Sequence, residues 1–151
     1  MLLKDKVAII TGAAEGIGAG VAEAFIEHGA RCLLADIKKD AVEAHAAALR
    51  VKGGEASGYP VDVTDAAQIK SVVDAAMERY GRIDILINNA GVYPRQEFLG
   101  MTEEQWDQMQ DINVKSIFHT SRLVAPIMVA QRSGHMVNIS SVTFFLGTKN
   151  L

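Results

Sequence analysis

The chain has 151 residues, enough for one domain with a buried core, and a composition ordinary for a globular protein, 49% hydrophobic and 22% charged. Its formal net charge of −3 gives no electrostatic case for nucleic acid or an anionic membrane surface as a partner. Because no apolar stretch approaches the ~20 residues of a membrane span, charges follow Met1 too soon for a signal peptide, and Cys32 is the one cysteine, we expect a cytoplasmic protein.

Short apolar runs and helical patterns alternate through the first part of the chain. Val7–Ile10 predicts a strand rich in β-branched residues, and the apolar face of Val21–Ile26 predicts a helix that ends at Gly29. Cys32–Ala35 predicts a second buried strand, and the alanine-rich segment from about Lys39 to Val51 predicts a second helix.

The alternation continues in the second part. The further expected elements are, in order, a strand around Ala56–Val63, a helix capped by Thr64 or Asp65, a strand at Ile83–Ile87, a helical region from Thr102 to Gln131 with a break or kink, and a strand at Met136–Ile139. Thr102 begins a capping-box pattern, and Pro126 is expected to bend the helix because it removes a backbone donor. The predicted fold class is α/β, a doubly wound parallel sheet of about five strands with helices on both faces, in a single domain over residues 1–151.

A glycine-rich turn follows the first strand directly. It has the sequence Thr11-Gly12-Ala13-Ala14-Glu15-Gly16-Ile17-Gly18 and opens into a helix. Glycines in this position let the backbone approach a pyrophosphate, and the free N–H groups of a helix N-terminus favour the anion. The spacing G-x-x-x-G-x-G differs from the generic G-x-G-x-x-G fingerprint, so a tight strand-to-helix turn without a ligand is the alternative for the glycines alone.

Asp36 ends the second strand, 36 − 18 = 18 residues after Gly18. A carboxylate there can accept both hydroxyls of an adenosine ribose and would repel a 2′-phosphate, by ~1 kcal/mol per charge pair in water and ~4 kcal/mol at a partly shielded surface. Glu15 adds a second negative charge near the same pocket, and Ile37 supplies no cation. These residues predict a nicotinamide dinucleotide, NAD rather than NADP. The alternative is a helix-capping aspartate and a solvated glutamate.

The polar motifs after the later strands extend this pattern. They are Asp62-Val63, Asn88-Asn89-Ala90-Gly91, Asn113 and Asn138-Ile139-Ser140-Ser141. With Thr11–Gly18 and Asp36 they resemble, in order and spacing, the short-chain dehydrogenase/reductase family. The resemblance extends from Lys4 to Ser141 and implies a Rossmann-like, nucleotide-binding fold whose sheet has the order 3-2-1-4-5-6-7.

The resemblance also implies a role for each matching residue. Asp62 and Val63 would meet the adenine, Asn113 would hold a helix distortion and a water in a proton relay, and Ser141 would hydrogen-bond the substrate carbonyl or hydroxyl. The full set of expected cofactor-binding residues is Gly12, Glu15, Gly16, Ile17, Gly18, Asp36, Ile37, Asp62, Val63, Asn89, Ala90 and Gly91. Catalytic roles fall to Ser141 and Asn113, and no metal site is expected. The four histidines are interpreted as surface or capping groups. The alternatives are a polar turn at residues 88–91, a surface asparagine and a turn-forming serine.

The likeness does not continue past Ser141. In the family a Tyr-x-x-x-Lys motif follows the serine, and counted from Ser141 both positions fall beyond Leu151; none of Tyr59, Tyr80 and Tyr93 lies in such a pattern. A positioned acid or base is typically worth roughly 10²–10⁴-fold in rate, so we expect these 151 residues to be truncated relative to the family and catalytically inactive alone. The fifth strand would then be an open apolar edge beside Phe144–Leu146, which predicts self-association or instability.

Three interpretations of function remain open. The favoured one is an oxidoreductase that transfers a hydride between NAD(H) and a secondary alcohol or ketone, seen here as a truncated or frame-shifted copy. The second is a non-catalytic NAD-binding or interaction remnant of a truncated gene, and the third is an incomplete product with no function of its own. The expected partners are a small-molecule alcohol or ketone substrate and, since family members are commonly dimers or tetramers, further copies of the chain.

Overall fold

Five parallel strands form one sheet in the order β3-β2-β1-β4-β5 in the computed structural model, which describes residues 1–142 and Phe145. The strands are β1 (Val7–Thr11), β2 (Arg31–Asp36), β3 (Glu55–Pro60), β4 (Ile85–Asn88) and β5 (His135–Asn138). The first strand lies at the centre of the sheet, the next two extend it outward to β3, and the chain then crosses back to form β4 and β5 on the other side of β1. The predicted α/β fold class is confirmed.

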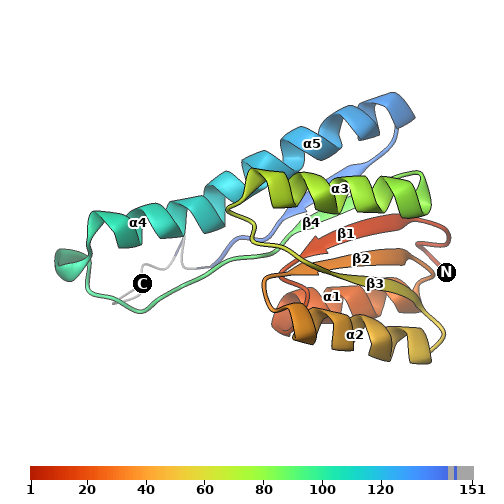
Figure 1. The fold of residues 1–151 in the computed structure, drawn as a ribbon, viewed down its shortest axis with the longest axis horizontal. Coiled ribbons are helices and arrows are strands. Elements are labelled where there is room, and N and C mark those ends of the chain that lie inside the picture. Colours follow the sequence, from red (N-terminus) through yellow and green to blue (C-terminus); the bar gives the residue numbers. More distant parts are fainter. Residues whose placement is uncertain (143–144, 146–151) are drawn as a thin grey trace.

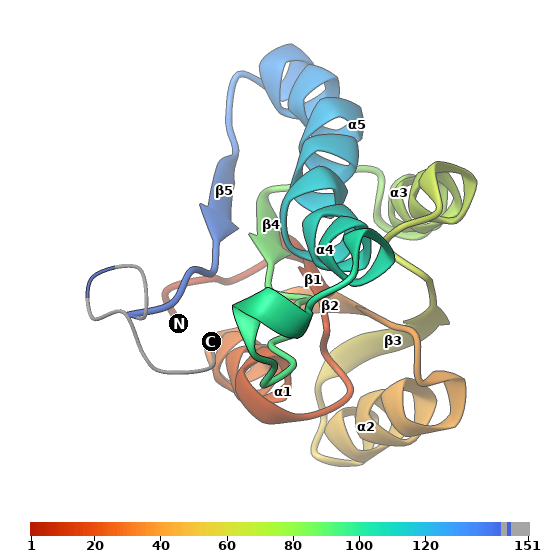
Figure 2. The same cartoon turned by 90° about the vertical axis from the view of Figure 1, so that its left-hand side faces the viewer.

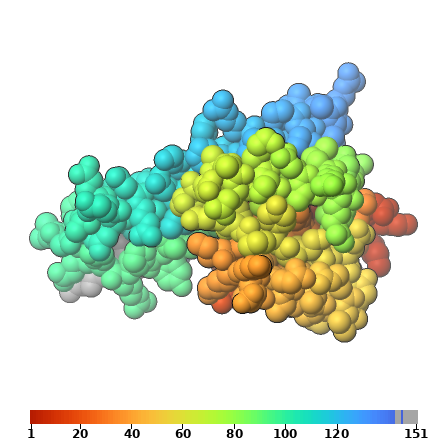
Figure 3. All heavy atoms as spheres, in the orientation of Figure 1, coloured from red at the N-terminus to blue at the C-terminus, as the bar shows by residue number. Residues whose placement is uncertain are grey.

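Helices cover both faces of the sheet. They are α1 (Gly16–Glu27), α2 (Lys39–Val51), α3 (Ala66–Tyr80), α4 (Glu103–Gln110) and α5 (Ser116–Gln131). Figure 1 shows α1 and α2 on one face and α3 and α5 on the other, with α4 reaching beyond the sheet. In the space-filling view, α4 and the segment that precedes it project from the body of the molecule (Figure 3). None of the helices within the described residues is both long and apolar enough to cross a membrane.

The core is divided by the sheet into two layers. In β1, Val7 and Ile9 face the layer formed with α3 and α5, whereas Ala8 and Ile10 face the layer formed with α1 and α2. Both layers are apolar because β1, at the centre of a parallel sheet, is covered on both faces. Cys32 is fully buried in the second layer, and burial raises the pKa of its thiol to about 12. The thiol is therefore a packing group, which agrees with the buried strand predicted at Cys32–Ala35.

Helix boundaries predicted from local sequence signals agree well with the structure. The helix predicted from Lys39 to Val51 has those bounds, and Asp65 rather than Thr64 caps α3 by accepting hydrogen bonds from the N–H groups of residues 67 and 68. The capping box at Thr102 is formed. Pro126 lies inside an unbroken α5; the carbonyl that loses its partner belongs to Arg122, on the exposed side of the helix, where water can replace the missing donor.

One strand is shorter than predicted. β3 ends at Pro60 rather than near Val63. The Val61 N–H still donates to the Asp36 carbonyl at 2.9 Å, but the Asp62 side chain accepts from the Thr64 N–H at 2.9 Å and turns the chain toward α3. An aspartate that bonds the backbone two residues ahead competes with strand pairing.

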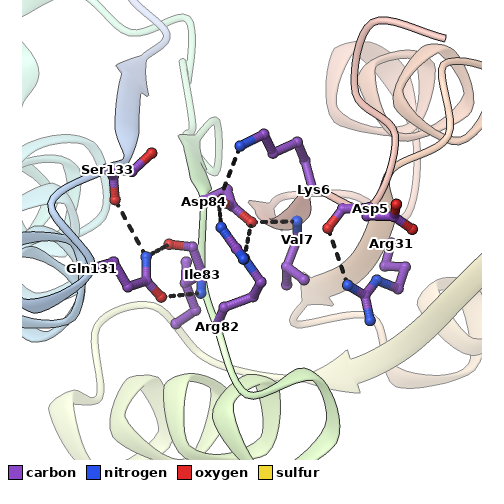
Figure 4. A network of polar contacts seen from close by, with 9 residues as sticks. All are labelled: Asp5, Lys6, Val7, Arg31, Arg82, Ile83, Asp84, Gln131 and Ser133. Atoms are coloured by element: carbon purple, nitrogen blue, oxygen red, sulfur yellow. Dashed lines mark hydrogen bonds and ion pairs between the residues drawn. The ribbon is translucent and has the colours of Figure 1, made fainter.

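A buried carboxylate joins the amino ends of β1 and β4 (Figure 4). Asp84 has a side chain 3% exposed and accepts hydrogen bonds from Arg82 at 2.6 and 2.8 Å and from the Val7 N–H at 3.0 Å. Lys6 lies 3.5 Å away. Burial acts to raise the pKa of Asp84, but the hydrogen bonds from Arg82 and Val7 and the charges of Arg82 and Lys6 prevail, so that pKa is lowered. Asp84 is thus held as an anion that fixes where the two strands begin.

Gln131 extends the same polar network to the end of α5 (Figure 4). Its side-chain amide accepts from the Ile83 N–H at 3.1 Å and donates to the Ile83 carbonyl at 2.8 Å. Both backbone groups of the residue that precedes Asp84 are thereby satisfied. The amino edge of the sheet is therefore closed by polar contacts that have structural roles.

The fifth strand lies at an edge of the sheet. β5 pairs with β4, and within residues 1–142 no strand pairs with its other side. Val137 and Ile139 are 45% and 39% exposed there. Of the apolar residues expected beside this edge, Phe144 and Leu146 lie outside the described residues, and self-association through the edge stays a prediction.

Candidate functional site

The predicted site residues gather at the carboxyl ends of the strands. Figure 2 views the molecule from this side. The glycine turn follows β1, Asp36 ends β2, Asp62 follows β3, Asn89 follows β4 and Ser141 follows β5. In open parallel sheets, ligands bind outside this edge, near the point where the strand order reverses. Here the order reverses between β1 and β4.

Thr11 and Asn89 lock the end of β1 to the end of β4. The Thr11 hydroxyl donates to the Ile87 carbonyl at 3.3 Å and accepts from the N–H groups of Asn89 and Ala90 at 3.0 and 3.1 Å. The Asn89 amide nitrogen donates to the carbonyls of Thr11 and Gly12, both at 3.0 Å. Asn89, predicted to line the cofactor, therefore also fixes the position of the glycine turn.

We expect Thr11→Val to lower the free energy of unfolding by about 2 kcal/mol, because two N–H groups beside a buried hydroxyl lose their acceptor. Urea denaturation measures this. Thr11→Ser keeps the hydroxyl and should lose less than half as much. Equal losses in the two variants would show that the hydroxyl contributes no more than the methyl group, which would contradict this account.

The glycine turn has the shape that close approach to a ligand requires. Gly12 and Gly16 have φ of +65° and +62°, in the left-handed region that glycine adopts without strain. A Cβ at Gly12 would lie 2.9 Å from the Ala90 Cα. A Cβ at Gly18 would overlap the Gly12 carbonyl oxygen and lie 2.6 Å from the Asn89 amide nitrogen. Two of the three glycines are therefore required by packing within the turn.

The N-terminus of α1 opens onto this turn without a side-chain cap. Its N-cap residue Glu15 makes no capping hydrogen bond, and its first turn contains no acidic residue. Ile17 is 66% exposed there. Uncapped N–H groups and the helix dipole favour an anion at this end. The turn and helix thus fit the diphosphate of a dinucleotide.

Asp36 lies beside the glycine turn. Its carboxylate accepts from the Ala14 N–H at 3.0 Å and from the Lys38 N–H at 2.9 Å. These contacts orient the carboxylate at the end of β2, where it can meet a ribose bound against the turn. Ile37 is 69% exposed. The structure therefore brings Asp36 and the glycine turn together, as the sequence predicts.

The second expected negative charge does not stand alone. Glu15 was expected to add a second negative charge near the pocket, with no cation supplied by Ile37, but the Lys38 amine lies 2.5 Å from its carboxylate. The prediction considered only Ile37 as the source of a cation in the loop after β2. The cation comes instead from Lys38, the next residue. The argument against a 2′-phosphate therefore depends mainly on Asp36.

Asp62 and Val63 follow β3 on the far side of Asp36. The Asp62 carboxylate accepts from the Thr64 N–H at 2.9 Å and the Thr64 hydroxyl at 2.7 Å, and its own N–H donates to Gln68 at 2.9 Å. Val63 is 9% exposed and belongs to the core. The two residues therefore lie at the correct edge, where a base could meet the Asp62 side chain and the backbone of Val63.

Asn88, the last residue of β4, connects this strand to α5 and β5. Asn88 is 4% exposed. Its side-chain oxygen accepts a hydrogen bond from the Thr120 hydroxyl at 2.7 Å, and its side-chain nitrogen donates to the Asn138 side chain at 2.9 Å. Asn138 leads into Ser140 and Ser141. Asn88 thus positions the segment that carries the predicted catalytic serine. Ser141 itself is exposed.

Asn113 lies in a π-helical turn, Asp111–Lys115, between α4 and α5. Its side chain is bonded to the segment after β4: it accepts from the Val92 N–H at 2.8 Å and donates to the Val92 carbonyl at 2.9 Å. A Cβ at Gly91 would lie 3.0 Å from the Asn113 oxygen. The helix distortion expected at Asn113 is present, while its part in a proton relay stays a prediction.

We expect Asn113→Ala to speed hydrogen exchange at the Val92 amide roughly tenfold, because the amide loses its acceptor. Amide exchange followed by NMR measures this. Lys115→Ala, which breaks an exposed ion pair with Asp111 in the same turn, should leave the Val92 rate unchanged. Equal acceleration in both variants would mean that the turn has melted as a whole.

An open groove adjoins Asn113. Gly91, Val92, Tyr93, Pro94, Gln108 and Met109 line it. Tyr93 is 81% exposed, whereas Tyr80 is in the core with its hydroxyl 3.1 Å from Ser57. Among the described residues, no group of three or more His, Cys, Asp or Glu side chains could hold a metal ion.

Comparison with known proteins assigns this arrangement to a family. The model of the short chain dehydrogenase family matches residues 6–151. The chain belongs to the short chain dehydrogenase family. Among solved structures, a short chain dehydrogenase/reductase from Burkholderia phymatum in complex with NAD is 34% identical, with a TM-score of 0.95 over 100% of this chain and 54% of the other.

Curated relatives in the short chain dehydrogenase family agree. A 3-oxoacyl-[acyl-carrier-protein] reductase of Thermotoga maritima is 40% identical over 97% of this chain and 60% of its own length. A galactitol 2-dehydrogenase of Agrobacterium fabrum is 43% identical over 93% of this chain and 54% of its own length. This short chain dehydrogenase sequence therefore spans little more than half the length of the relatives it matches.

A second residue of this short chain dehydrogenase chain was misjudged from the sequence. His45 was interpreted as a surface group, but its ring is half-buried on α2 and its Nδ1 donates to the Ala13 carbonyl in the glycine turn at 2.9 Å. Its Nε2 lies 3.8 Å from the Glu23 carboxylate. The helical spacing of His45 with Val42 and Leu49, both buried, was the signal that could have placed it on the packed face.

Proposed function

We propose that these residues bind NAD in an oxidoreductase that transfers a hydride between NAD(H) and a secondary alcohol or ketone. The observation that carries the proposal is the contact between the Asp36 carboxylate and the Ala14 N–H of the glycine turn, 3.0 Å. It brings the carboxylate that we propose to bind the ribose beside an uncapped helix N-terminus, an arrangement that supports dinucleotide binding. The B. phymatum relative in complex with NAD supports the choice of cofactor.

Each group of residues has a separate part in this proposal. Gly12, Gly16 and Gly18 allow the diphosphate to approach the backbone, with Ile17 at the first turn of α1. Asp36 and Ile37 adjoin the ribose, and Asp62 and Val63 adjoin the adenine. Asn89, Ala90 and Gly91 line the remainder of the cofactor. These assignments follow the family resemblance together with the placement of every one of these residues at the carboxyl edge.

The chemistry would take place beyond β4 and β5. The bound dinucleotide supplies the hydride acceptor or donor. Ser141 would hydrogen-bond the substrate oxygen, and Asn113 would hold the segment after β4 and a water. The relatives' names refer to a 3-oxo group and to position 2 of a sugar alcohol, which supports a carbonyl or hydroxyl at a secondary carbon.

We further propose that a polypeptide of only these 151 residues binds the cofactor without turnover. Proton transfer to or from the substrate needs a positioned acid or base. Tyr80 is in the core, and Tyr59, Tyr80 and Tyr93 have no lysine four residues beyond them. Such a polypeptide would act as a non-catalytic NAD-binding module, which is the alternative function. Cofactor-dependent oxidation of a secondary alcohol by it would disprove this.

Asp36→Asn tests the cofactor assignment. Asparagine keeps an acceptor for the Ala14 N–H but removes the charge that a 2′-phosphate would meet. The ratio of the NADPH and NADH dissociation constants should fall roughly fivefold to several-hundredfold, measured by calorimetry. Glu78→Gln, which removes an exposed charge on α3, is the matched control. An unchanged ratio for Asp36→Asn would contradict the proposal.

A further inference from the structure

Two loops from neighbouring strands meet over the carboxyl edge through an ion pair. The Lys38 amine lies 2.5 Å from the Glu15 carboxylate, with side chains 55% and 71% exposed. The Lys38 N–H also donates to the Asp36 carboxylate at 2.9 Å. Lys38 is therefore attached by its backbone to the carboxylate proposed to bind the ribose, and by its amine to the glycine turn.

The ion pair stabilises the charged form of Lys38 and engages its ammonium group with Glu15. The hydrogen bond to Glu15, and then the charges of Glu15 and Asp36, raise the pKa of Lys38. A lysine ammonium is a compact charge with three donors and binds phosphate well when it is available. Here the Lys38 ammonium donates to the Glu15 carboxylate at 2.5 Å. The Lys38 ammonium is thus a cation suited to a 2′-phosphate, but it is paired with the Glu15 carboxylate.

We propose that Glu15 selects against a 2′-phosphorylated cofactor chiefly by holding Lys38, rather than by repelling the phosphate itself. This inference rests on the proposed function. NAD and NADP differ only in the group on the 2′-oxygen of the ribose. The two loops bring the charged side chains of Asp36, Lys38 and Glu15 together beside the glycine turn, where the proposed function puts the ribose. Removing the Glu15 charge would free Lys38 to meet the phosphate.

The two explanations differ in the sign of one coupling. If Glu15 acts by holding Lys38, removing its charge helps a 2′-phosphate only while Lys38 is present. If Glu15 repels the phosphate directly, removing its charge helps at least as much when Lys38 is absent, because the carboxylate is then unpaired. A double-mutant cycle separates the two cases.

The test compares four proteins: the unchanged chain, the Glu15→Gln variant, the Lys38→Met variant and the double variant. Calorimetry gives the dissociation constants of adenosine 2′,5′-bisphosphate and 5′-AMP, and the ratio of the two cancels effects that both nucleotides share. We expect Glu15→Gln to lower the bisphosphate-to-AMP ratio about fivefold when Lys38 is present, the upper range for one exposed pair, and less than twofold with Met at position 38.

Asp74→Asn is the matched control, because it breaks an equally exposed lysine–carboxylate pair, Lys70–Asp74, on α3. Its ratio should stay at the value of the unchanged chain. An equal or larger effect of Glu15→Gln in the Lys38→Met background, or no effect in either, overturns the inference alone. If the unchanged chain binds neither nucleotide, the proposed function fails and the inference fails with it.

Discussion

Replacing Gly18 by alanine is expected to weaken NADH binding about 10- to 100-fold. The added Cβ would overlap the Gly12 carbonyl oxygen and lie 2.6 Å from the Asn89 amide nitrogen. Asn89 is bonded to the carbonyls of Thr11 and Gly12, so it cannot move without releasing the turn. Overpacking of this kind costs roughly 1–3 kcal/mol, and 1.4 kcal/mol is tenfold in affinity. Fluorescence titration with NADH measures the loss.

The matched control lies in the same helix. Gly20 has open space around its Cβ position, and alanine forms helix better than glycine by about 1 kcal/mol. Gly20→Ala should therefore raise the melting temperature and leave the NADH dissociation constant within twofold. If both substitutions weakened binding equally, the account of Gly18 as a packing requirement of the turn would be wrong.

Replacing Asp84 by alanine is expected to have the largest effect on stability, about 3 kcal/mol. The substitution leaves the Val7 N–H without its acceptor at the start of β1 and removes the partner of Arg82 and Lys6. For a chain of this size, such a loss lowers the melting temperature by about 6–12 °C. Asp74→Ala removes an exposed ion pair on α3 and should cost less than about 1 kcal/mol. Equal losses would refute a special role for Asp84.

The same carboxylate predicts how stability depends on pH. The pKa of Asp84 is lowered in the folded chain, net of the opposing effect of burial. The stabilisation is therefore complete above the unfolded-state pKa of about 4 and is lost as the pH falls through the lower folded-state pKa. The difference in unfolding free energy between the unchanged chain and Asp84→Asn should be constant from pH 7 to about 4 and shrink below that. A difference that grew toward acid pH would contradict this sign.

The carboxyl ends of the strands carry the candidate site, whereas the amino ends are joined by contacts that stabilise the fold. The sequence indicated only the residues at the carboxyl ends. The carboxyl edge was predictable because its motifs are local: the glycine turn, Asp36 and Asn89 each follow an apolar run that predicts a strand. The contacts at the amino edge were not predictable, because Asp84 stabilises the fold by accepting a hydrogen bond from the N–H of Val7, which is 77 residues away in the sequence. Charged residues before a strand have no local pattern that distinguishes a buried anion from a solvated one.

The same distinction explains the errors within the site. Glu15 and Lys38 are 23 residues apart, and their pairing depends on how two loops meet over the sheet. His45 bonds the glycine turn 32 residues earlier. By contrast, the helix Lys39–Val51 and the capping box at Thr102 were predicted with the correct bounds because propensity and capping act within one turn.

The most direct test of the central claim is a fluorescence titration of the 151-residue chain with NADH, run beside NADPH. We predict saturable binding of NADH, with a dissociation constant at least about fivefold lower than that of NADPH, because Asp36 meets the ribose and repels a 2′-phosphate. Absence of saturable NADH binding, or tighter binding of NADPH, would contradict the account.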